Sequence, residues 1–201
     1  SATTAVSISA DGQAAALASS DSQRLSGDTN SASDIFLYIS GSDLSRISNS
    51  FTNTAVAANG ASTTPVISQD GQIVAFTSAA TNLVLNDTNE VNDIFVYDRS
   101  NSEITRVSVR SNGTQANGAS SEPALSADGR FVAFVSAATN LDSLRTDTNG
   151  YSDIFVHDRN TSSTVRVSIR GEFEANAASS APVVYGHGAS DFYAVFASSA
   201  S

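Results

Sequence analysis

Residues 87–110 read DTNEVNDIFVYDRSNSEITRVSVR, and this stretch decides the fold because its motifs occur three times along the chain. The triplet Asp-Thr-Asn begins at Asp28, Asp87 and Asp147, so successive copies are 59 and 60 residues apart. A dipeptide Asp-Gly also recurs, with spacings of 59 and 58 residues. A period of this length is typical of propeller and solenoid arrays, so we expect a repeat architecture.

Each repeat is expected to form four β-strands. In the second repeat the pattern predicts strands at 65–68, 73–77, 93–97 and 104–110. Asp70-Gly71, between the first two, favours a tight hairpin turn because Asp and Gly accept positive φ. The connecting segments are rich in Ser, Thr and Asn, and no window carries a helical stripe.

The hydrophobic pattern of these strands distinguishes between all-β folds. Residues 73–76 and 94–97 are apolar on both faces, whereas residues 105–110 alternate between apolar and polar side chains. Strands of a two-layer sandwich would all alternate. Central strands covered on both faces, beside a half-solvated outer strand, are typical of a propeller blade. We therefore predict an all-β fold of propeller-type four-stranded blades.

The combined motifs resemble a known family. Ser-x-Asp-Gly, Val-Ala-Phe, Asp-Ile-Phe-Val-x-Asp-Arg and Arg-Val-Ser together resemble the TolB-like β-propeller repeat, and Asp-Thr-Asn before Asp-Ile-Phe is similar to a secreted bacterial subset of that family. The resemblance covers residues 1 to about 180, as three full repeats of about 59 residues with blades at 1–62, 63–121 and 122–180. It implies a β-propeller and, as one alternative, a periplasmic protein.

Residues 181–201 are predicted to form the inner strand pair of an incomplete fourth blade. We treat 1–201 as a single repeat domain. A closed propeller usually has about 4–8 blades, and an unpaired strand edge invites further pairing. Three interpretations follow: a fragment of a longer propeller, a four-bladed propeller with one blade half built, or open edges that pair between copies of the chain.

Composition excludes several function classes. The chain has 20 acidic and 10 basic residues, a net charge of −10, so nucleic acid is not expected as a partner. It contains no Cys, which excludes disulfides, thiol catalysis and zinc–thiolate sites. No apolar run approaches the ~18 residues of a membrane-spanning helix.

The pattern Asp-Thr-Asn-x-x-x-Asp is the strongest site signal. Oxygen ligands at alternate loop positions, closed by a carboxylate, suit a structural Ca²⁺ ion. The alternative is that these side chains form Asx turns with the loop backbone. The candidate metal ligands are Asp28, Asn30 and Asp34 in the first repeat, Asp87, Asn89 and Asp93 in the second, and Asp147, Asn149 and Asp153 in the third.

No catalytic constellation recurs, so we expect no enzyme. His157 replaces Tyr97 of the preceding repeat and is predicted to be a packing residue, and His187 lies in a Gly-containing turn. Neither lies in a recurring context with an acid, and no nucleophile elbow is present. The repeated arginines, Arg46, Arg106 and Arg166, are expected to form exposed ion pairs at the rim, with Asp98 or Asp158 as partners.

The sequence therefore predicts a non-enzymatic, extracellular or cell-surface, structural or adhesive module. Its expected partners are other copies of itself, assembled into filaments by completing blades between molecules, or other surface proteins. The alternative is a ligand- or protein-binding propeller domain that forms part of a larger periplasmic or extracellular protein.

Overall fold

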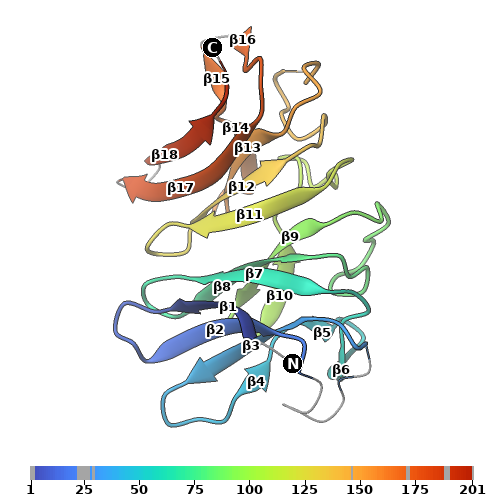
Figure 1. Ribbon diagram of the computed structural model, residues 1–201, viewed down its shortest axis with the longest axis vertical. Helices are drawn as coiled ribbons and strands as arrows, with labels where there is room; N and C mark the ends of the chain where they lie inside the picture. Colours follow the sequence, from blue (N-terminus) through green and yellow to red (C-terminus); the bar gives the residue numbers. More distant parts are fainter. Residues whose placement is uncertain are drawn as a thin grey trace.

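The computed structural model describes residues 3–21, 28, 30–145, 147–170, 173–187 and 191–200. Their regular secondary structure is entirely β (Figure 1), and they contain no helix long and apolar enough to cross a membrane. Three sheets have four antiparallel strands each, in sequential order. The all-β blade fold predicted from the sequence is confirmed.

The first sheet contains β1 (Thr3–Ile8), β2 (Ala14–Ser19), β3 (Asp34–Ile39) and β4 (Ser45–Arg46). The second contains β7 (Ser62–Ile67), β8 (Ile73–Ser78), β9 (Asp93–Asp98) and β10 (Glu103–Arg106). The third contains β11 (Ser120–Leu125), β12 (Phe131–Ser136), β13 (Asp153–Asp158) and β14 (Ser163–Arg166). Two ribbons follow the first and third sheets, β5 (Asn49–Ser50) with β6 (Asn53–Ala57), and β15 (Ile169–Arg170) with β16 (Phe173–Glu174).

A two-stranded hairpin follows the third blade. It consists of β17 (Ser179–His187) and β18 (Asp191–Ser198), and its turn at 188–190 lies outside the described residues. β17 carries the register shift that interrupts the first strand of each full blade, between Ser180 and Val183. The hairpin is therefore the inner half of a fourth blade, and in the described part of the chain β18 pairs only with β17.

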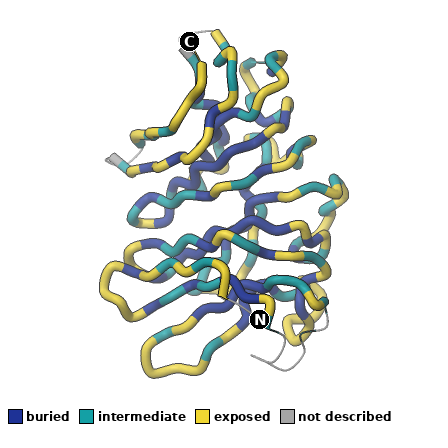
Figure 2. The backbone as a smooth tube through the Cα atoms, in the orientation of Figure 1, coloured by how far each residue is buried: buried dark blue, intermediate teal, exposed yellow. Residues whose placement is uncertain are grey.

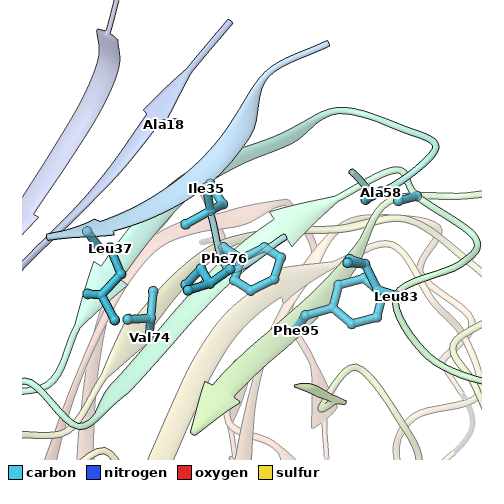
Figure 3. Packing of buried hydrophobic residues seen from close by; sticks show 11 residues of the cluster. Ala18, Ile35, Leu37, Ala58, Val74, Phe76, Leu83 and Phe95 are labelled. Atoms are coloured by element: carbon cyan, nitrogen blue, oxygen red, sulfur yellow. The ribbon is translucent and has the colours of Figure 1, made fainter. Parts of the chain in front are cut away.

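The blades stack face to face, with the two chain ends in the first and last blades (Figure 1). The core consists of three apolar clusters, one at each contact between successive blades. Figure 3 shows the first cluster, in which Ile35 and Leu37 of blade 1 meet Val74 and Phe76 of blade 2. Burial is greatest along the strands of the two middle blades (Figure 2), and all six residues of β8 and of β12 are buried.

The outer strand is shorter than the sequence predicts. β10 ends at Arg106 rather than at residue 110. The cause is Ser108, whose side chain turns inward: its hydroxyl accepts the Ile94 N–H at 3.1 Å and donates to Asp93. This side-chain bond replaces a ladder bond, so regular pairing with β9 stops there.

Candidate functional site

One buried polar site occurs in each full blade, where the third strand begins. Asp93 opens β9, is fully buried, and accepts a 2.5 Å hydrogen bond from the Ser108 hydroxyl through Oδ1. In the first blade Ser48 donates to Asp34 at 2.7 Å, and in the third Ser168 donates to Asp153 at 2.6 Å. The last Asp of the calcium-like motif and the Ser of Arg-x-Ser therefore meet in every blade.

The Asn of each motif joins its blade to the next repeat. Its amide nitrogen Nδ2 donates to a backbone carbonyl oxygen in the segment that leads to the following blade. The pairs are Asn30 with Ala58 at 2.7 Å, Asn89 with Ala116 at 2.9 Å, and Asn149 with Ala175 at 2.9 Å. This contact gives the recurring Asn a structural role between blades.

The repeated arginine lies within this polar site in two blades. Arg106 Nη1 is 2.8 Å from Asp87 Oδ1 and 3.5 Å from Asp93 Oδ2. The third blade concentrates more charge: the Arg166 guanidinium is fully buried and approaches four carboxylates. Their distances are 3.0 Å for Asp153, 3.2 Å for Glu174, 3.5 Å for Asp147 and 3.8 Å for Asp142.

The predicted exposed rim pairs of these arginines are wrong. Asp98 pairs with Arg159, and Asp158 pairs with Arg130, each at 2.8 Å. Arg106 and Arg166 point inward instead, because each pairs with the residue two positions after the aspartate that begins the third strand, and residues two apart in a strand share a face. Phe155 is the cross-strand partner of Arg166, which places the arginine next to Asp153.

The first blade differs from the other two. Arg46 donates from Nε to Asn49 at 2.8 Å and from Nη2 to the Ala55 carbonyl at 3.3 Å. Asp34 Oδ2 and Arg46 Nη1 are both buried without a hydrogen-bond partner. Buried atoms without a hydrogen-bond partner also occur in the other two blades, for example Arg106 Nε and Asp147 Oδ2, so the first blade differs in the groups that its arginine contacts.

Burial controls the protonation of these carboxylates. Removal from water raises the pKa of Asp34, Asp87, Asp93 and Asp147, because the charged form is the one that loses solvation. Neighbouring carboxylates add to the rise: Asp93 acts on Asp87, and Asp153 acts on Asp147. The arginines oppose this effect and stabilise the ionised forms.

The arginine–carboxylate contacts occupy oxygens that a bound Ca²⁺ ion would need. In blades 2 and 3 a guanidinium nitrogen already lies within 3.0 Å of a motif carboxylate, where a Ca²⁺ ion would need the oxygen at 2.3–2.6 Å. Among the described residues, no group of three or more His, Cys, Asp or Glu side chains is arranged to hold a metal. Calcium binding stays a prediction, and buried motif oxygens without a hydrogen-bond partner occur at Asp34 in blade 1 and at Asp147 in blade 3.

His157 is a buried side chain of the third blade. Its Nδ1 lies 2.9 Å from the Thr164 hydroxyl, and burial lowers its pKa to about 4. The imidazole is therefore neutral at pH 7, as expected of a packing residue. The side chain of His187 lies outside the described part of the structure.

A second candidate site is formed by the outward faces of the two end blades. On the hairpin, four large apolar side chains are exposed: Val183, Tyr185, Tyr193 and Val195, at 63%, 61%, 59% and 69%. On the first blade, Val6, Ile8 and Tyr38 are exposed at 55%, 62% and 43%. We call these the C-terminal face and the N-terminal face.

The chain is similar to solved propeller structures. It aligns with TolB from Acinetobacter baumannii at a TM-score of 0.52 and 17% identity, covering 96% of this chain and 40% of that one. A putative TolB from Agrobacterium tumefaciens gives a TM-score of 0.51 and 20% identity, covering 85% and 50%. The fold is that of a TolB-like β-propeller.

The likeness to TolB lies in the fold. This chain spans half or less of the length of the two TolB structures, and the identities are low. The tricorn protease also aligns, at a TM-score of 0.50 and 15% identity, with 17% of its chain covered. No protein-family model and no curated protein sequence matches this chain.

Proposed function

We propose that this chain is a non-enzymatic, extracellular structural module that assembles into filaments through its unfinished fourth blade. The observation that carries the proposal is the hairpin β17–β18. Each full blade has four strands, whereas this sheet has two in the described chain, with its outward face apolar and exposed. Unpaired strand edges can pair with another chain, and large exposed apolar patches mark interaction sites.

The rest of the chain supports a structural role. The recurring polar motifs of the three repeats are used for buried bonds between strands and between blades, which leaves them unavailable to a substrate. A charge of −10 and the absence of Cys suit an exposed extracellular protein. The family resemblance makes the periplasm the alternative location.

The competing proposal is a binding domain of a larger protein. The short length of the chain favours this proposal, because the chain aligns with only 40% and 50% of the two TolB structures. Under this proposal further blades of the same polypeptide cover both end faces, and the domain binds a protein or ligand.

Analytical ultracentrifugation and negative-stain images of the purified chain separate these proposals. We expect oligomers or filaments at ~100 μM, a concentration at which contacts with micromolar dissociation constants are occupied. A homogeneous monomer at that concentration would refute assembly and favour the binding domain.

A further inference from the structure

The internal contacts between blades define which sides of a blade meet. In β7, neighbouring residues point to opposite neighbours: Ile67 packs against the cluster shared with blade 1, and Val66 against the cluster shared with blade 3. β11 repeats this division, with Leu125 facing blade 2 and Ala124 facing the hairpin. One position of the first strand thus serves the preceding blade and the adjacent position serves the following blade.

The exposed apolar residues occupy these same positions at the two ends. Ile8 pairs with Ala15 as Ile67 pairs with Val74, so Ile8 is the residue that would face a preceding blade. Val183 pairs with Val195 as Val66 pairs with Ala75, so Val183 would face a following blade. The N-terminal and C-terminal faces are therefore the two halves of one interface that the chain already forms three times internally.

The Asp-Gly turns show the same missing neighbour. A Cβ on Gly71 would lie 2.9 Å from Ala14 of the preceding blade, and a Cβ on Gly129 would lie 2.6 Å from Ile73. Gly12, in the equivalent turn of the first blade, has nothing within 4 Å. The Asp-Gly turn of blade 1 therefore lacks the preceding blade that the equivalent turns of blades 2 and 3 pack against.

Neither end face is capped by polar residues. Soluble repeat arrays normally end in repeats whose outer side is polar, because the apolar side that faces a neighbour would otherwise be exposed. The large side chains of both faces are uncharged, although the chain carries a net charge of −10. These large side chains would not oppose like charges in a contact between two copies, although the exposed Asp191 lies on the same side of β18 as Tyr193 and Val195.

We infer that the occupant of the C-terminal face is a second copy of this chain, whose first blade packs on β17–β18 as the next blade in the stack. This inference rests on the proposed self-assembly and names its contact. The contact is heterologous, since the two faces are different surfaces, so it propagates into a filament or closes into a ring. Both faces of every molecule except the terminal ones are then buried.

Two substitutions on opposite faces test the contact. Ile8→Asp places a carboxylate on the N-terminal face and Val183→Asp places one on the C-terminal face. A carboxylate buried opposite apolar side chains should weaken the contact at least ~100-fold. Both positions are more than half exposed, so each variant should keep the circular dichroism spectrum of the wild type. Leu144→Asp is the matched control, because Leu144 is 83% exposed and lies between β12 and β13 of the third blade, outside both the first blade and the hairpin.

The decisive measurement is the mass of the particles formed when the Ile8→Asp and Val183→Asp variants are mixed in equal amounts. Each variant alone should be monomeric, whereas their mixture should form 1:1 dimers that grow no further. The Ile8→Asp molecule retains a good C-terminal face, and the Val183→Asp molecule retains a good N-terminal face. Leu144→Asp should assemble like the wild type.

The outcomes separate the inference from the proposed function. If the wild type assembles and both variants assemble equally well, another surface makes the contact, and only the inference is overturned. Dimers of a single variant on its own would also overturn it, because they indicate a contact between identical faces. A monomeric wild type overturns both.

Discussion

Replacement of Arg166 by glutamine probes the charged site of the third blade. The wild-type guanidinium is fully buried, with oxygens of Asp153, Glu174 and Asp147 at 3.0, 3.2 and 3.5 Å from Nη1. Glutamine keeps a polar side chain but removes the positive charge. The carboxylates then face one another without a counter-charge in a site shielded from water.

The size of the effect follows from the burial of the pair. Asp153 and Arg166 are both fully buried, and removal of one partner of a buried ion pair costs about 3–5 kcal/mol. For a domain of 150–250 residues, each kcal/mol lowers Tm by about 2–4 °C. We therefore expect Tm to fall by about 6–20 °C.

Thermal unfolding followed by circular dichroism measures this change. Arg159→Gln is the control, because Arg159 and its partner Asp98 are 21% and 25% exposed, and such pairs contribute about 1 kcal/mol or less. The control should lose at most a few degrees. If Arg166→Gln loses no more than Arg159→Gln, the buried arginine does not compensate the carboxylates, and our account of the site is wrong.

Three further predictions concern other parts of the chain. Calcium should raise the Tm of Arg166→Gln more than that of the wild type, because the released carboxylate oxygens suit a cation; equal responses would count against this. His157 has a pKa of about 4 in the folded protein against 6.5 unfolded, so its contribution is present above pH 6.5 and is lost as pH falls toward 4. This pKa difference corresponds to about 3 kcal/mol in the free energy of unfolding. His157→Tyr installs the residue of the second repeat and should therefore make Tm depend less on pH between pH 7 and 5. Gly118→Ala should lower the free energy of unfolding by about 1–3 kcal/mol, since its Cβ would lie 2.7 Å from the Ala137 carbonyl oxygen; urea titration measures the loss, and an unchanged midpoint would contradict the packing.

The blade architecture was predictable because the distribution of apolar residues along each strand indicates which of its faces are buried. Residues 73–76 are apolar on both faces, and the structure buries every one of them between two neighbouring blades. The hairpin after the third blade was predictable for a similar reason, since the repeat pattern continues into β17–β18. In both cases local sequence alone specifies the contact.

The partners of the arginines were not predicted, because they depend on the register between two strands. Asp153 and Arg166 are 13 residues apart, and nothing local shows that the turn between β13 and β14 returns the arginine to the aspartate. A signal was nevertheless present. The motif Asp and the Ser of Arg-x-Ser are separated by 14, 15 and 15 residues in the three repeats, a near-constant spacing that marks a cross-strand pair.

Hydrogen bonds and an aromatic contact between blades hold the hairpin β17–β18 in a fixed position on the third blade. Ser179 N–H donates to the Ser152 carbonyl at 2.9 Å, as Ser62 and Ser120 donate to the preceding blades at 2.6 and 2.7 Å. Phe192 packs against Phe131 with ring centroids 5.2 Å apart, so the inward face of the hairpin is anchored to blade 3. A surface held in place before binding loses less conformational entropy when it docks. Under the proposed assembly, the same bonds that order the blades within one chain would hold the last one in place for the first blade of another.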